Sequence, residues 1–356
     1  MIGRLRARGC EVLVIHHEPD LADGDESFAL RGRVAFQRRV VFAGLGSRQQ
    51  VARLLRDKAV DLVHLSIPFS TLDFRLPDLC HDLGIPIVVT FHVPFARVKS
   101  FWPAMAAGLY RLYAPSLARC DRVVVLGEVQ RQLLVRLGVP PERIAVLPNG
   151  VDLDRYRPGV SQMHTELGAE RIFTYVGRID PEKQVETLVR AFLAVSPPDS
   201  HRLAVVGSGV ELSRLRRRYR DPRVIFFGAV QEEARRIDIL RASDAFFLPS
   251  RVEAMSIAML EAMACATAVV ATDVGDHGDA LRGAGIVIDP ARLREDLEAA
   301  IRSLIDSPAC CRELGRLARE RALERFSIDR NLDCLMGLYD EAIRSRQVGT
   351  VALSAG

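Results

Sequence analysis

The sequence predicts an α/β protein with two doubly wound domains, and three observations lead to this prediction. The chain has 356 residues, the length of about two domains. Short apolar runs alternate with helical patterns, which is typical of βαβ units and parallel sheets. A Pro-, Gly- and Asn-rich stretch between residues 148 and 159 interrupts the alternation and predicts an interdomain linker. We expect two facing parallel-sheet domains, with a ligand crevice between them at the carboxyl ends of both sheets.

The first domain, predicted over residues 1–153, contains five apolar runs. Each is rich in Val, Ile and Leu, as expected of strands covered on both faces. The predicted strands are 11–15, 60–65, 85–91, 122–126 and 144–147, and helical patterns cover 47–58 and 128–137.

The second domain, predicted over residues 154–326, repeats this rhythm. The predicted strands are 172–176, 202–206, 224–227, 245–248, 268–271 and 285–288, and the predicted helices are 185–194, 211–219, 231–242 and 257–264. After Pro290 the pattern is helical, and a carboxyl-terminal helix over 327–346 is predicted to pack back on the first domain.

The composition excludes several classes of protein. Hydrophobic residues make up 49% and charged residues 26%, which is typical of a globular protein. The net charge of +4 is too small to predict a nucleic acid as the main partner. The seven cysteines are odd in number and lack Cys-x-x-Cys spacing, so we expect neither a disulfide framework nor a zinc site. No apolar run approaches the roughly 18 residues that cross a bilayer, and a cytoplasmic location is predicted.

The strongest candidate site follows the predicted strand 245–248. Glu253 is expected in the loop after this strand and Glu261 inside the next helix. The amides of Met255, Ser256 and Ile257 are expected at the start of that helix, where unpaired N–H groups attract phosphate. A carboxylate beside such a site suits sugar or ribose hydroxyls. A solvated loop acid at Glu253 fits the same spacing equally well.

Two cations follow the strand 172–176. Arg178 and Lys183 are predicted to lie over the crevice, as a diphosphate leaving group requires, because negative charge grows on it as the glycosidic bond breaks. Surface cations on an ordinary turn are the alternative. Lys183 is one of only three lysines in the chain, which favours the functional interpretation slightly.

Two further positions carry weaker signals. Gly207 lies in a Gly-Ser-Gly turn after a strand, where the backbone approaches either a ligand or simply the next residues of a tight turn. His92 follows the strand 85–91 and is predicted to project into the crevice from the first domain. There it suits a bond to a sugar hydroxyl, although a structural histidine is the alternative.

Taken in order, these segments resemble glycosyltransferase family 4, a retaining group with the GT-B fold of two Rossmann-like domains. The resemblance covers about residues 9 to 339. Its landmarks are CDRVVVL at 120–126, LPNGVD at 147–152, VGR at 176–178 with EK at 182–183, VGSG at 206–209, the Glu253/Glu261 pair, and VATDVG at 270–275.

The resemblance implies a transferase that moves a sugar from a nucleotide-sugar donor to a glycan, lipid-linked or small-molecule acceptor. It implies catalytic roles for His92 and Glu253 at the transferred sugar. The donor-binding residues that it implies are Arg178, Lys183, Gly207, Met255, Ser256, Ile257 and Glu261. It also implies same-face attack assisted by the leaving diphosphate, with no cofactor and no essential metal. Asp152-Leu153-Asp154 matches an Asp-x-Asp metal motif only superficially, and no metal is assigned to it.

Several positions depart from the family pattern. Ala254 and Ala266 stand where the family usually has glycine, which alone is free at positive φ. The loop after Gly275 carries His277 between two acids. That arrangement suggests a metal site, but an exposed polar loop is the favoured interpretation.

The amino end departs most. The family's first strand and Gly-rich loop have no counterpart here, and we hypothesise that the natural start lies upstream. The alternatives are a truncated or inactive nucleotide-sugar-binding homologue and, in another class, a sugar-nucleotide epimerase.

Residues 97–113 combine the only Trp with two Tyr and three cations. Such a stretch suits peripheral contact with the inner face of an anionic membrane, where a lipid-linked acceptor would lie. A core or crevice-lining helix explains the same residues and is favoured.

Overall fold

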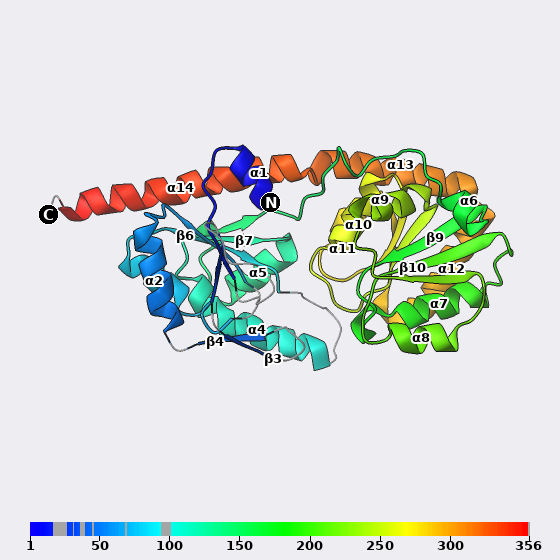
Figure 1. The fold of residues 1–356 in the computed structure, drawn as a ribbon, viewed down its shortest axis with the longest axis horizontal. Coiled ribbons are helices and arrows are strands. Elements are labelled where there is room, and N and C mark those ends of the chain that lie inside the picture. Colours follow the sequence, from blue (N-terminus) through cyan, green and yellow to red (C-terminus); the bar gives the residue numbers. More distant parts are fainter. Residues whose placement is uncertain are drawn as a thin grey trace. The chain divides into compact units, whose positions relative to one another are not determined.

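The computed structural model describes residues 1–16, 27–30, 32–35, 40–44, 46–67, 70–93 and 101–354. These fall into two compact units, each considered by itself (Figure 1). The first unit spans Met1–Val93, Ala107–Leu147 and Leu332–Gly356, and the second spans Pro94–Ala106 and Pro148–Asn331.

The second unit is built on a six-stranded parallel sheet. Its strands are β9 (Arg171–Val176), β10 (His201–Val206), β11 (Val224–Gly228), β12 (Ala245–Leu248), β13 (Ala268–Thr272) and β14 (Ile286–Ile288). The spatial order is β11-β10-β9-β12-β13-β14. This doubly wound order reverses direction between β9 and β12, and ligands bind outside the carboxyl ends of the strands at such a switch point.

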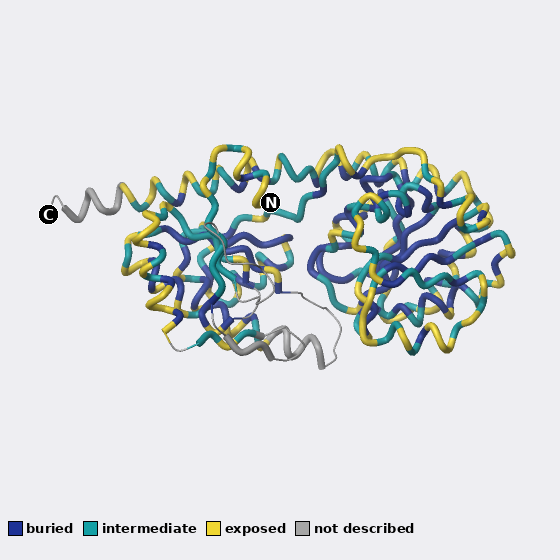
Figure 2. Tube along the Cα trace, in the orientation of Figure 1, coloured by how far each residue is buried: buried dark blue, intermediate teal, exposed yellow. Residues whose placement is uncertain are grey.

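Helices cover both faces of this sheet. They are α6 (Met163–Leu167), α7 (Val185–Ala194), α8 (Leu212–Arg218), α9 (Glu233–Ala242), α10 (Ile257–Ala264), α11 (His277–Leu281), α12 (Leu293–Asp306) and α13 (Pro308–Arg325), with short 3₁₀ turns at Pro181–Lys183 and Pro290–Arg292. The two-sided cover makes the central strands wholly buried, as Figure 2 shows in dark blue. The predictions for α7, α10 and β12 match the observed bounds.

The first unit contains a smaller parallel sheet. Its strands are β5 (Val63–Ser66), β6 (Ile87–Phe91), β7 (Arg122–Val125) and β8 (Ile144–Val146), in that spatial order. The helices in this half of the chain are α1 (Ile2–Ala7), α2 (Ser47–Asp57), α3 (Leu76–Asp82), α4 (Phe101–Leu117) and α5 (Glu128–Arg136), with a 3₁₀ turn at Pro141–Arg143. The expected α/β class with parallel sheets is therefore confirmed.

Two short strand pairs lie outside this four-stranded sheet. β1 (Val14–His16) pairs in parallel with β2 (Ser27–Ala29), and β3 (Gly32–Ala35) pairs in antiparallel fashion with β4 (Val40–Ala43). The strand predicted at 11–15 thus forms only in part and does not join β5. β5 is an edge strand of its sheet, and all its residues keep some exposure.

The long helix α14 (Ile328–Ser354) packs on the first unit. Its residues Leu332, Leu335 and Ala342 share a buried cluster with Leu5 of α1, Val88 of β6 and Val124 of β7. Arg346 Nε adds an ion pair to Asp121 Oδ1 at 2.9 Å. The apolar face of α14 thereby covers one face of the four-stranded sheet.

Candidate functional site

An ion pair joins the loops that follow β9 and β12. Lys183 Nζ contacts Glu253 Oε1, and Ser250 Oγ donates a hydrogen bond to the same oxygen at 3.2 Å. The Lys183 and Glu253 side chains are only 11% and 17% exposed. The backbone N–H of Arg251 also donates to the carbonyl of Glu182 at 2.8 Å. The fold therefore brings the predicted phosphate-binding lysine and the predicted sugar-binding carboxylate together at the switch point of the sheet.

Arg178 lies in the same loop as Lys183 but on the surface, with 54% of its side chain exposed. Its guanidinium contacts Asp180 Oδ2 and pairs with Glu182 Oε1 at 3.0 Å. The Tyr175 hydroxyl donates to the Arg178 carbonyl at 2.5 Å, and burial raises the pKa of that phenol. Two acids thus compensate the positive charge of Arg178.

Gly207 allows the loops after β9 and β10 to touch. It has φ +137°, and a Cβ on it would lie 1.8 Å from the carbonyl oxygen of Gly177. Gly177 N–H donates to the Val206 carbonyl at 3.0 Å, and Ile179 N–H donates to the Ser208 carbonyl at 2.8 Å. This contact between two loops admits only glycine at position 207, and the donor-binding role of Gly207 stays a prediction.

The helix α10 begins at Ile257, as predicted. Ser256 is its N-cap, and its hydroxyl accepts a hydrogen bond from Met259 N–H at 3.4 Å. Met255 is buried, and its carbonyl accepts a bond at 2.9 Å from the side-chain amide of Asn149. The sequence landmark at Asn149 thus anchors the loop that leads into the positive end of α10.

Glu261 is the fifth residue of α10 and lies more than one turn beyond the capped end. Burial raises its pKa, and a hydrogen bond from the Tyr156 hydroxyl opposes that shift. The Tyr156 hydroxyl also lies 3.4 Å from Glu233 Oε1. Glu261 therefore has a set of neighbours different from those of Glu253.

His92 lies at the end of β6 in the first unit and is exposed. Its neighbour His64 is half-buried between Tyr339 of α14, whose hydroxyl contacts Nδ1, and Thr90, whose Oγ1 lies 2.8 Å from Nε2. Desolvation, followed by the charge of His92, lowers the pKa of His64 to about 4. His92 belongs to a different unit from the other candidate residues, and its role stays a prediction.

The prediction for His277 is wrong. It is not in an exposed loop: its side chain is fully buried at the start of α11, because the loop after β13 folds onto the loop that carries Glu253. Among the described residues no group of three or more His, Cys, Asp or Glu side chains could hold a metal ion. Asp152 Oδ1 instead accepts backbone N–H bonds from Asp154 and Arg155, both at 3.2 Å, which explains that motif as a local turn.

The two alanines at glycine positions behave differently. Ala254 is buried and is absent from the residues with positive φ in the described chain. Ala266 has φ +62°, the left-handed region that favours glycine. Only the second substitution therefore strains the backbone.

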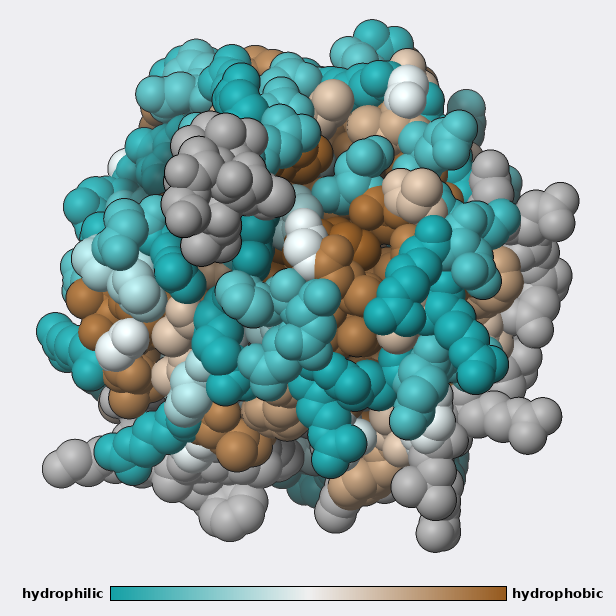
Figure 3. Space-filling model, turned by 90° about the vertical axis from the view of Figure 1, so that its left-hand side faces the viewer, coloured by the Kyte–Doolittle hydropathy of each residue, from teal (hydrophilic) through white to brown (hydrophobic). Residues whose placement is uncertain are grey.

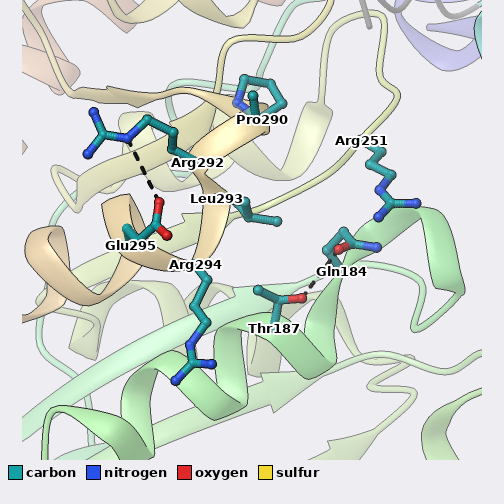
Figure 4. A pocket seen from close by; sticks show the side chains of 9 residues that line it. Gln184, Thr187, Arg251, Pro290, Arg292, Leu293, Arg294 and Glu295 are labelled. Carbon is teal, nitrogen blue, oxygen red and sulfur yellow. Dashed lines mark hydrogen bonds and ion pairs between the residues drawn. The ribbon is translucent and has the colours of Figure 1, made fainter. Parts of the chain in front are cut away.

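A shallow pocket of about 210 Å³ lies next to the loops of the ion pair (Figure 4). Gln184 and Thr187 line it from the start of α7, and Arg251 lines it from the loop after β12. The remaining lining residues, from the segment that leads into α12, are Pro290, Ala291, Arg292, Leu293, Arg294 and Glu295. Arg292 pairs with Glu295 at 3.8 Å and Arg294 with Glu298 at 2.8 Å, so acids offset much of its positive charge.

The segment 97–113 is described only in part. Tyr110 and Tyr113 are buried, and the Tyr110 hydroxyl donates to the Val93 carbonyl at 2.9 Å, so both tyrosines belong to the core. The membrane prediction for residues 97–107 lies outside the side chains that the structure describes.

Figure 3 shows hydrophobic side chains gathered in patches among hydrophilic ones on one face. In the described part of the chain, every helix is too short or too polar to cross a bilayer.

A doubly wound sheet with cations, a carboxylate and a helix start at its switch point has the layout of a nucleotide-binding domain. Solved two-domain glycosyltransferases share this fold. Sucrose-phosphate synthase from Thermosynechococcus elongatus superposes with a TM-score of 0.70 and 20% identity, over 99% of this chain and 91% of the other. HepE from Anabaena, in complex with UDP-glucose, superposes with a TM-score of 0.67 and 19% identity, over 86% and 84%. The fold is GT-B, with two Rossmann-like domains.

Sequence comparisons then identify the family. A family model described as Glycosyltransferase Family 4 matches residues 1–155, and one described as Glycosyl transferases group 1 matches residues 170–307. The chain is 31% identical to the D-inositol 3-phosphate glycosyltransferase of Gordonia bronchialis, over 96% of this chain and 82% of that protein. It is 36% identical to the protein of the same name from Rhodococcus opacus, over 72% of this chain. This chain belongs to glycosyltransferase family 4.

The match with the Rhodococcus opacus protein spans 62% of that relative's length. The corresponding figure for the Rhodococcus jostii relative is 61%. The chain therefore matches less than two thirds of these relatives.

Proposed function

We propose that this protein is a retaining glycosyltransferase that takes a sugar from a nucleotide-diphosphate sugar and transfers it to a hydroxyl acceptor. The observation that carries the proposal is the Lys183–Glu253 pair at the switch point of the second unit's sheet. An ammonium suits the donor's diphosphate, and a carboxylate beside it suits the hydroxyls of the attached sugar. HepE and its complex with UDP-glucose support a nucleotide sugar as the donor class.

The role proposed for each residue depends on the loop or helix that carries it. Lys183 and Arg178 lie after β9 and would meet the diphosphate, whose negative charge grows as the glycosidic bond breaks. The N–H groups at Ser256 and Ile257, at the positive end of α10, would face the same phosphates. Glu261, whose carboxyl accepts a hydrogen bond from the Tyr156 hydroxyl, would hold the ribose. His92 would contact the sugar from the first unit.

In the proposed reaction the acceptor attacks the face from which the diphosphate departs. An oxygen of the leaving diphosphate takes the acceptor's proton. The cations of the site stabilise the negative charge that develops on the diphosphate, a role that a metal ion would otherwise fill. The acceptor belongs to the class of glycans, lipid-linked sugars or small polyols. The named activity of the relatives makes inositol 3-phosphate one member of that class to test.

A donor screen followed by product analysis tests the proposal. Thermal unfolding would be measured with UDP-, GDP- and ADP-sugars, since a bound donor raises the unfolding temperature by mass action. The stabilising donor, radiolabelled in the sugar, would then be incubated with inositol 3-phosphate, with glycans and with lipid-linked acceptors in liposomes, each with and without EDTA. A glycoside with retained anomeric configuration and undiminished yield in EDTA is the expected product. An epimer would identify an isomerase, and binding without turnover would identify a binding protein.

A further inference from the structure

The fully buried His277 is the least explained polar side chain of the second unit. Its exposure is 0%, and neither Nδ1 nor Nε2 has a hydrogen-bond partner within the described chain. Leaving a buried polar group unpaired costs about 1–3 kcal/mol, a penalty that a leucine of similar size would avoid. Stability of the folded protein therefore does not explain this histidine.

Three contacts hold the loop of His277 against the loop of Glu253. Thr272 Oγ1 donates to the Ser250 carbonyl at 2.6 Å, and Asp276 N–H donates to the Ala254 carbonyl at 3.1 Å. A Cβ on Gly275 would lie 2.5 Å from the Glu253 carbonyl oxygen, so the two backbones touch there. The imidazole is consequently fixed beside the segment that carries the proposed sugar-binding carboxylate.

The charged groups that act on the imidazole are Glu253, Lys183 and Asp273, and the Thr272 backbone acts on it less than Glu253 but more than the other two. Burial outweighs all of them and lowers the pKa of His277. The ring is therefore neutral at pH 7 and offers one N–H donor and one acceptor nitrogen. A neutral N–H can donate a hydrogen bond to a carboxylate such as that of Glu253 without adding a second buried charge.

The carboxylate of Glu253 needs such a donor when Lys183 binds phosphate. Both contacts that the described residues make with this carboxylate, from Lys183 and Ser250, involve Oε1. A diphosphate competes for the same ammonium, and Glu253 at 17% exposure would lose the charge that compensates it. Without another donor this carboxylate would carry a largely buried charge that only Ser250 contacts, and such a charge is costly to leave uncompensated.

We propose that His277 is a positioning residue that donates its N–H to the Glu253 carboxylate while Lys183 binds the donor's diphosphate. This inference rests on the proposed function. It assigns His277 to recognition of the sugar and not of the nucleotide, because Glu253 is the group through which it acts.

The experiment compares His277→Leu with His277→Gln by calorimetric titration. Three matched pairs serve as probes, UDP-glucose with UDP, GDP-mannose with GDP, and ADP-glucose with ADP. For the pair that binds, His277→Leu is expected to bind the nucleoside diphosphate like the wild type and the nucleotide sugar about tenfold more weakly, the value of one hydrogen bond to a charged group. His277→Gln, whose amide also donates, is expected to recover most of the sugar-dependent affinity. His277→Leu is also expected to raise the unfolding temperature of the protein alone.

Three outcomes would overturn the inference. If His277→Leu bound the nucleotide sugar with unchanged affinity, His277 would have only a packing role. An equal loss for sugar and nucleotide in both variants would show a general distortion of the site. Failure of the wild type to bind any of the six compounds would remove the proposed function itself and the inference with it, and this result differs from the first two because it needs no variant.

Discussion

The two units use the same parallel βα plan but differ in how completely their sheets are closed in. In the second unit six strands lie in doubly wound order, and β12 and β13 are buried along their whole length. In the first unit four strands form the sheet, β5 is an edge strand, and β1 pairs elsewhere. A sheet covered on both faces can hold its carboxyl-end loops in mutual contact, and the second unit does so after β9, β10, β12 and β13. The comparison places the rigid, preorganised chemistry in the second unit.

The largest expected effect comes from breaking the ion pair of the second unit. Lys183→Ala would leave the Glu253 carboxylate partly buried without its cation, which costs about 3 kcal/mol or more of folding stability. It should also weaken turnover of the identified nucleotide sugar by about 100-fold or more. Lys58→Ala, an exposed lysine of the first unit, is the control and should change neither quantity. Equal behaviour of the two variants in thermal unfolding and turnover would contradict the assigned site.

A somewhat smaller effect is expected where the loops after β9 and β10 touch. Gly207→Ala would force a Cβ to within 1.8 Å of the Gly177 carbonyl oxygen and should lower the free energy of unfolding by about 3 kcal/mol. Gly337→Ala is the matched control in α14, where no atom lies within 4 Å, and should be neutral or slightly stabilising. Urea unfolding of both variants measures the difference. If Gly207→Ala left the free energy of unfolding unchanged, these two loops could separate without loss of stability.

Acid should affect the first unit through His64. Its pKa is lowered from 6.5 to about 4, so the folded state favours the neutral ring. Stability is then fully present above about pH 6.5 and is lost as the pH falls toward 4, by at most about 3 kcal/mol. Amide hydrogen exchange in β6 and β7 between pH 7 and pH 4 would follow this loss within the unit. His64→Gln, which cannot titrate, should flatten the pH dependence, and an unchanged slope would assign it to other groups.

The smallest effect concerns a strained alanine. Ala266 has φ +62°, so Ala266→Gly should raise the free energy of unfolding by about 1 kcal/mol. Ala262→Gly makes the same chemical change inside α10 and should lower it by about 1 kcal/mol or more, because it weakens the helix and also removes a buried methyl group. Chemical denaturation compares the pair. Destabilisation by both changes would mean that the strain at Ala266 is already relieved by its neighbours.

The sequence predicts the second unit better than the first for a physical reason. Buried parallel strands are continuous apolar runs, and the runs 245–248 and 268–271 stand out against polar turns. The run 245–248 has only four residues, but all four are apolar, whereas β1, β2 and β3 each include a polar residue, so no continuous apolar run marks them. The strand predicted at 11–15 therefore had a recognisable composition but no recognisable partner, because pairing depends on residues far along the chain.

The candidate site shows the same division. Glu253, Lys183 and the start of α10 were predictable because each follows an apolar run and because their order matches a family pattern. The interpretation of His277 as exposed failed because the two acids around it suggested a solvated loop, while the backbone contacts at Gly275 and Asp276 bury it. A signal was present nonetheless, since His277 follows a strand at the same edge of the sheet as the other candidates.

By itself the sequence determined the local elements and the loops that carry chemistry, because strand and helix periodicities and turn residues act over a few positions. Only the tertiary structure decided which loops meet. It joined Lys183 to Glu253 across 70 positions and enclosed the imidazole of His277, which has no hydrogen-bond partner among the described residues, beside the loop of that carboxylate. Those outcomes follow from strand order and close backbone packing, and strand order is a property of the folded sheet that no local pattern encodes.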